Sequence, residues 1–142
     1  GAVVSPFDAY LLHRGMETLE LRVSRANANA MAIATALSGD ARVTGLRYPG
    51  LAGDPANAAA RRQMKGFGPI VSFCLKDRET AEAFIARHPL VAAATSFGGV
   101  HSSAECRIRW GDAVPAGFIR FACGIEPVAD LVSATLAALD EA

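Results

Sequence analysis

The chain has 142 residues, enough for one domain with a substantial hydrophobic core. Its formal net charge is +0 at pH 7 and its pI is about 7.0, which argues against nucleic acid or an anionic membrane as a partner. Hydrophobic residues make up 51% and charged residues 20%, an apolar balance that predicts a surface patch covered by a partner.

The chain contains three cysteines, Cys74, Cys106 and Cys123, an odd number without CxxC spacing. This count argues against a disulfide framework and favours a reducing, cytoplasmic location. The first residues lack the basic and apolar regions of a signal peptide, and no apolar run is long enough to cross a bilayer. We therefore expect no membrane association.

The N-terminal part of the chain predicts helix. Ser5 is suited to the N-cap, Pro6 to the first helical position, and Asp8 stands where a capping box places its acid. Apolar residues then recur at steps of three and four over residues 19–37, which predicts one long amphipathic helix closed by a Ser-Gly pair. Gly15 is the expected bend between the two segments.

The rest of the chain predicts strands alternating with helices. A Pro-Gly turn, a glycine-rich break at residues 66–69 and an Asp cap at Asp77 separate these segments. Strands are expected at residues 43–48, 70–75, 91–96 and 118–123, and helices over residues 54–64, after Asp77 and over residues 128–139. Several strands covered on one face by helices make an α/β (α+β) sandwich.

Arg120 is the most informative single residue, because it interrupts the apolar strand at residues 118–122 and shares a face with Phe118 and Ala122. A half-buried guanidinium keeps its charge and needs an anionic partner, and its planar fork suits a carboxylate. Arg120 is thus a candidate for binding the carboxylate of an amino acid. The alternative is an internal salt bridge, for example to Glu126 or Asp130.

A short turn at residues 95–99 offers a second candidate. Its glycines let backbone approach a ligand closely, and Ser96 carries a hydroxyl there. An ordinary surface turn is the alternative. A phosphate-binding loop is not expected, because no helix follows this turn to present its N-terminus to a phosphate.

Other polar groups have weaker functional signals. The three histidines are scattered, and no pair has the spacing of metal ligands. His101 with Cys106 comes nearest to such a site, and we expect no metal. Lys65 and Lys76 are the only lysines, and both are expected in solvent. The charged segment 101–110 is expected to be a solvated loop rather than a nucleic-acid patch.

Five stretches, in order along nearly the whole chain, together resemble one enzyme family. They are SPFDAYLLHRGMETLELR (5–22), LRYPGL (46–51), GFGPIVSFCLKD (66–77), ATSFGGVHS (94–102) and GFIRFACGIEPVADLVSATLAAL (117–139). The family is the Cys/Met-metabolism group of fold-type-I pyridoxal-phosphate (PLP) enzymes. It includes cystathionine γ-lyase, cystathionine β-lyase, cystathionine γ-synthase, methionine γ-lyase and the homoserine-ester sulfhydrylases.

The resemblance implies roles for three residues. Arg120 matches the arginine that grips the substrate α-carboxylate, and Ser96 matches the serine that lines the same pocket. Thr95 stands where several lyases and synthases have an acidic residue beside the distal end of the substrate. The substrate implied is cystathionine or a related sulfur amino acid.

The resemblance also implies how the chain is organised. Residues 39–142 would be the C-terminal domain, a mainly antiparallel sheet with helices on one face, and residues 1–38 a helical arm leading to an absent N-terminal PLP-binding domain. That domain carries the Schiff-base lysine in the family, and neither Lys65 nor Lys76 matches it. We therefore expect a homotetrameric, PLP-dependent enzyme in which this chain alone holds no PLP and is inactive.

The reaction implied is carbon–sulfur bond elimination, because SFGGVHSSAE and the short VPAGFIRF most resemble bacterial cystathionine γ-lyases. The β-lyase, γ-synthase and sulfhydrylase reactions of the same family are alternatives. A different class of function is a non-catalytic domain for oligomerisation or for amino-acid binding, which the apolar composition and Arg120 would also suit.

Overall fold

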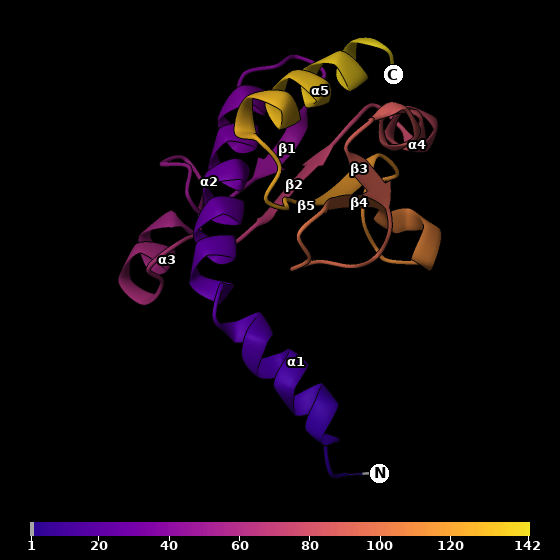
Figure 1. Cartoon of the computed structure of the whole chain (residues 1–142). Helices are drawn as coiled ribbons and strands as arrows, with labels where there is room; N and C mark the ends of the chain where they lie inside the picture. The colour runs from indigo at the N-terminus through magenta and orange to yellow at the C-terminus, as the bar shows by residue number, and fades with distance from the viewer. Residues whose placement is uncertain (1) are drawn as a thin grey trace.

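The computed structural model describes residues 2–142. Helices and strands follow one another along most of the chain, and a helical N-terminal arm extends away from the rest (Figure 1). The elements are α1 (Pro6–Met16), α2 (Leu19–Leu37), β1 (Thr44–Arg47), α3 (Asn57–Gln63), β2 (Ile70–Cys74), α4 (Arg78–Arg87), β3 (Val91–Ala93), β4 (Ser102–Cys106), a 3-10 turn (Arg107–Trp110), β5 (Phe118–Ala122) and α5 (Val128–Asp140).

One five-stranded sheet with the order β1-β2-β5-β4-β3 forms the centre of the molecule. All neighbouring strands are antiparallel except β3 and β4, which are parallel. The sheet is covered on one face by α2, α4 and α5, as Figure 1 shows. This arrangement confirms the predicted α/β fold with a mainly antiparallel sheet.

The core lies between that face and the helices. Residues Val71 and Phe73 of β2 and Ile119 and Phe121 of β5 are fully buried there, because alternate residues of a strand point to the same face. The ring of Phe73 meets that of Phe84 from α4 edge to face, with 5.8 Å between the centroids. The opposite face of the sheet is therefore free to carry polar residues.

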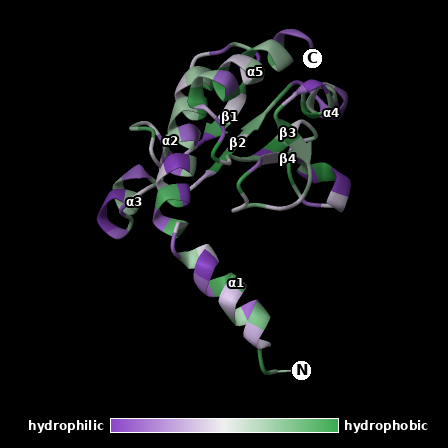
Figure 2. Cartoon of the chain, in the orientation of Figure 1, coloured by the Kyte–Doolittle hydropathy of each residue, from purple (hydrophilic) through white to green (hydrophobic). Residues whose placement is uncertain are grey.

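The N-terminal arm begins as predicted, since the Ser5 hydroxyl accepts a hydrogen bond of 3.1 Å from the backbone N–H of Asp8. Gly15, however, lies inside α1, and the break comes after Met16. The Arg22 guanidinium contacts this end of α1, donating a hydrogen bond of 2.9 Å to the carbonyl oxygen of Gly15. No residue from Pro6 to Met16 is buried, although several are apolar (Figure 2).

Three predicted elements differ from the structure. The helix expected from residue 54 begins at Asn57, because the Asp54 carboxylate instead accepts the backbone N–H of Tyr48 and of Ala56. The strand expected over residues 91–96 ends at Ala93. The segment 101–110, expected as a solvated loop, contains the interior strand β4, all five of whose residues are buried.

No helix within residues 2–142 combines the length and the apolar composition that a bilayer span requires.

Candidate functional site

Arg120 lies at the middle of β5, on the sheet face that points away from the helices. The strand register places it between Ser72 of β2 and Glu105 of β4. Its side chain is 24% exposed, so it is half-buried as the sequence predicted. Its charge is therefore held on the sheet face that the helices do not cover, and part of the guanidinium remains accessible to an anionic group.

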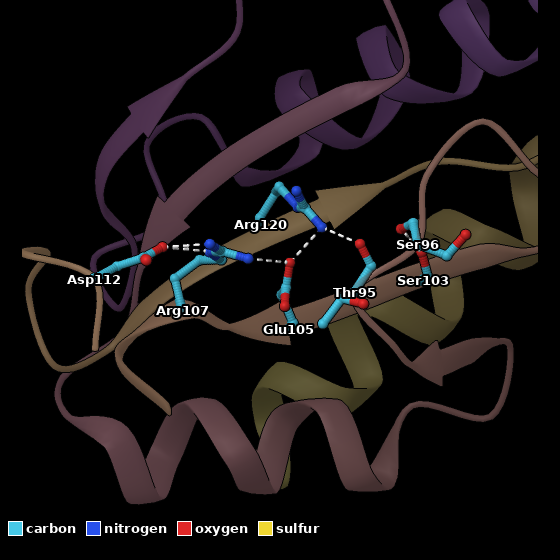
Figure 3. A network of polar contacts seen from close by, with 7 residues as sticks. All are labelled: Thr95, Ser96, Ser103, Glu105, Arg107, Asp112 and Arg120. Atoms are coloured by element: carbon cyan, nitrogen blue, oxygen red, sulfur yellow. Dashed lines mark hydrogen bonds and ion pairs between the residues drawn. The ribbon is translucent and has the colours of Figure 1, made fainter. Parts of the chain in front are cut away.

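Three groups contact the Arg120 guanidinium. It forms an ion pair with the Glu105 carboxylate and donates a hydrogen bond to the carbonyl oxygen of Thr95 (Figure 3). Its central carbon lies over the ring of Phe97, 5.2 Å from the ring centroid. The internal salt bridge considered for Arg120 therefore exists, but its partner is neither Glu126 nor Asp130.

Glu105 is the centre of a small charge network. Its side chain is only 6% exposed, and its Oε1 atom accepts a hydrogen bond of 2.9 Å from Arg107 as well as the contact with Arg120. Arg107 is bound in turn by Asp112, with 2.6 Å between Nε and Oδ2. The two carboxylates and two guanidinium groups balance in charge, so a further anion would have to compete with Glu105 or Asp112.

The Thr95 and Ser96 positions lie beside this network, where Figure 3 shows them with Arg120. Thr95 contributes its backbone carbonyl, and the Ser96 carbonyl accepts a hydrogen bond of 2.7 Å from the Ser103 hydroxyl. Both residues are exposed. Gly98 follows with φ of +81°, a conformation that favours glycine and turns the chain back toward β4. The structure thus brings the three predicted site residues together.

A buried polar clamp fixes the end of this loop. The Glu126 carboxylate accepts the backbone N–H of Ser102 at 2.5 Å and its hydroxyl at 2.8 Å. The Ser102 hydroxyl accepts the N–H of Gly124 at 2.9 Å, and Asn29 of α2 donates to the carbonyl oxygens of Gly124 and Glu126 at 3.0 and 2.9 Å. Helix α2, the loop and the C-terminal segment are therefore held as one unit.

Glu105, Arg107 and Asp112 were not predicted as site residues. The available signal was the alternation of charge with small residues in SAECR, which places Glu105 and Arg107 on one side of an extended chain. Glu126 was considered only as a partner for Arg120. Its observed role as the clamp on Ser102 was not predicted.

The described residues do not fit a complete PLP site. Lys65 and Lys76 are both exposed and lie outside the Arg120 network. A lysine that forms a Schiff base is activated by an enclosed, desolvating pocket, which neither position provides. Among residues 2–142, no three His, Cys, Asp or Glu side chains are grouped so as to hold a metal ion.

Comparison with known proteins gives a consistent family. Residues 1–140 match the sequence profile described as Cys/Met metabolism PLP-dependent enzyme. A Streptomyces coelicolor protein provisionally named cystathionine gamma-lyase is 51% identical over 99% of the chain, and Mycobacterium leprae cystathionine gamma-synthase is 42% identical over 93%. The chain spans 36% of the length of each of these curated relatives.

Solved structures agree with the sequence relatives. An O-acetylhomoserine sulfhydrylase of Wolinella succinogenes superposes with a TM-score of 0.91 at 30% identity, over 98% of this chain and 40% of the other. A cystathionine gamma synthase of Xanthomonas oryzae pv. oryzae, solved in complex with cystathionine, superposes with 0.87 at 37% identity, over 96% and 38%. The chain belongs to the Cys/Met metabolism family of PLP-dependent enzymes and has the fold of part of a fold-type-I enzyme.

Proposed function

We propose that this chain is the C-terminal, substrate-binding part of a PLP-dependent carbon–sulfur lyase of the cystathionine γ-lyase type. The observation that carries the proposal is Arg120, a partly exposed guanidinium on the sheet face away from the helices, beside the turn that contains Thr95 and Ser96. A planar fork of donors at such a place suits the α-carboxylate of an amino acid. Ser96 would line the same pocket, and Thr95 would face the distal end of the substrate.

The choice of γ-lyase among the family's reactions rests on the relatives. Identity is 51% to the provisionally named γ-lyase, 42% to a γ-synthase and 34% to a cystathionine beta-lyase of Lactococcus lactis. The substrate would be cystathionine or a related sulfur amino acid. The γ-synthase, β-lyase and sulfhydrylase reactions remain alternatives within the same family.

Residues 1–38 would form the arm that packs on the remaining part of the protein, and residues 39–142 the C-terminal domain. Support comes from the large apolar side chains of α1, since Phe7, Leu12 and Met16 are 68%, 61% and 54% exposed in the chain alone. Such a surface is also suited to a homotetramer. The three free cysteines support a cytoplasmic location for the assembled enzyme.

The role of Arg120 is testable with Arg120→Lys in a full-length protein that contains this chain. Lysine keeps the charge but replaces a bidentate fork by a point charge, so KM for cystathionine is expected to rise by about tenfold or more. Steady-state kinetics give the value. The matched control is Arg87→Lys, an exposed arginine on α4, which should leave KM unchanged. A wild-type KM in Arg120→Lys would disprove the proposed role.

A second experiment concerns the cofactor. The purified chain is incubated with PLP, reduced with borohydride and mapped by mass spectrometry. Because Lys65 and Lys76 are both exposed, we expect no stoichiometric adduct at either lysine, and no release of 2-oxobutyrate or pyruvate from cystathionine. Selective and complete labelling of one lysine would show instead that this chain binds PLP by itself.

A further inference from the structure

The contacts of Arg120 determine how it can take up a carboxylate. A guanidinium grips a carboxylate through one of two forks, formed by Nε with Nη2 or by Nη1 with Nη2, so Nη2 belongs to both. Here Nη2 of Arg120 is already paired with Oε1 of Glu105 and donates to the carbonyl oxygen of Thr95. The Thr95 oxygen is neutral, whereas Glu105 carries the same charge as an incoming carboxylate. Bidentate binding therefore displaces either Glu105 or the Thr95 carbonyl oxygen from Nη2, and Glu105 is the one that an incoming carboxylate repels.

Glu105 has a second cation available. Arg107 donates to the same Oε1 atom at 2.9 Å, and Asp112 fixes Arg107 from the other side at 2.6 Å (Figure 3). A buried carboxylate that loses its sole cation is strongly destabilised. Because Arg107 stays, Glu105 would keep a partner after Arg120 turned toward a substrate.

Glu105 is also incompletely bound in the present arrangement. Both arginines contact Oε1, while Oε2 is buried and has no hydrogen-bond partner among residues 2–142. A carboxylate with one unsatisfied oxygen gains from a rotation that brings this oxygen to Arg107. The Phe97 ring meanwhile lies 5.2 Å from the guanidinium carbon of Arg120, and this cation–π contact can persist through such an exchange.

We propose that Glu105 stands in for the substrate carboxylate, pairing with Arg120 while the site is empty and passing to Arg107 when an amino acid binds. Glu105 and Arg107 are thus positioning residues that act through Arg120 and set substrate affinity. The inference rests on the proposed function of Arg120 as the carboxylate ligand. It goes beyond that function by giving the site an internal competitor and a place for the competitor to go.

The test uses two substitutions in the full-length protein that are expected to shift KM in opposite directions. Glu105→Gln keeps the shape and removes the competing charge, so KM for cystathionine should fall by about threefold or more, with a smaller change in kcat. Arg107→Gln leaves Arg120 as the only cation for Glu105, so KM should rise by about threefold or more. If Glu105 merely oriented Arg120, both substitutions would raise KM.

Glu79→Gln and Arg87→Gln are the matched controls, because they make the same chemical changes at exposed positions on α4. Should the amide variant fail to fold, Glu105→Met removes the same charge with a similar length and should also lower KM. A KM that rises or stays constant in the folded Glu105 variant overturns the inference. If the Glu105 variant gives that result while Arg120→Lys raises KM, only this inference is overturned. An unchanged KM in Arg120→Lys would instead remove the proposed function itself.

Discussion

Acidifying the chain from pH 6.5 to pH 4 is expected to reduce its free energy of unfolding by about 3 kcal/mol through His88 alone. Burial lowers the pKa of His88 from 6.5 to about 4, and the nearby Glu126 carboxylate offsets only part of this. The unfolded chain therefore takes up the proton first as pH falls. The contribution of His88 to the free energy of unfolding is complete above pH 6.5. It is lost between pH 6.5 and about pH 4 and changes no further below that.

The contacts of His88 explain why its neutral form is required. The ring is 4% exposed and packs edge to face between Phe84 and Phe121. Its Nδ1 atom accepts the backbone N–H of Leu90 at 3.2 Å, so the proton is on Nε2, which donates to the Thr135 hydroxyl at 3.0 Å. A second proton on Nδ1 would face another N–H group inside the core.

Urea unfolding of the wild type and of His88→Gln at pH 7 and pH 4.5 measures this effect. The loss of free energy on acidification should be markedly larger in the wild type, and His101→Gln, at an exposed position, should behave as the wild type. The Asp40 carboxylate does not obscure the comparison. A side-chain hydrogen bond from Arg42 lowers the pKa of Asp40 to about 2, so its contribution is lost below pH 4. Equal losses in wild type and His88→Gln would contradict the prediction.

Local sequence signals were sufficient wherever the structure depends on neighbours along the chain. Ser5 and Asp77 each accept the backbone N–H three residues on, as their cap positions predicted. The alternation over residues 70–75 placed Val71, Phe73 and Leu75 on one face, and all three are buried. Both patterns are short-range, because a helix cap and the buried face of a strand each depend on residues only a few positions apart.

Strand β4 was missed because its stability comes from distant residues. Its sequence, SSAEC, has small and charged side chains and no apolar alternation. Glu105 is buried there only because β5 places Arg120 opposite it and Arg107 lies on its other side. For the same reason the partner of Arg120 was sought nearby in sequence, at Glu126 and Asp130, and not across the sheet. Arg120 and Ser96 stood out locally as an arginine in an apolar strand and a hydroxyl in a glycine-rich turn, whereas the substrate roles of both, and of Thr95, came from the family resemblance and remain predictions.

Gly124 is a position where a single added carbon should disturb the packing of the loop before β4. A Cβ atom there would lie 2.4 Å from the carbonyl oxygen of Val100 and 2.7 Å from the backbone nitrogen of Ser102. Both are backbone atoms at the end of the Thr95–Gly99 turn, so no side chain can rotate away. The Gly124 N–H also donates to the Ser102 hydroxyl, and its carbonyl oxygen accepts a hydrogen bond from Asn29. Moving the two segments apart would therefore break the clamp between α2 and the loop.

Gly124→Ala is therefore expected to destabilise the chain by at least about 3 kcal/mol, through overpacking against backbone and loss of buried hydrogen bonds. The matched control is Gly53→Ala, since a Cβ atom at Gly53 meets nothing within 4 Å, and its free energy of unfolding should stay within about 1 kcal/mol of the wild type. Urea unfolding at pH 7 compares the three proteins. A Gly124→Ala chain as stable as Gly53→Ala would show that the loop can move apart from α2, and the clamp would then not fix the turn beside Arg120.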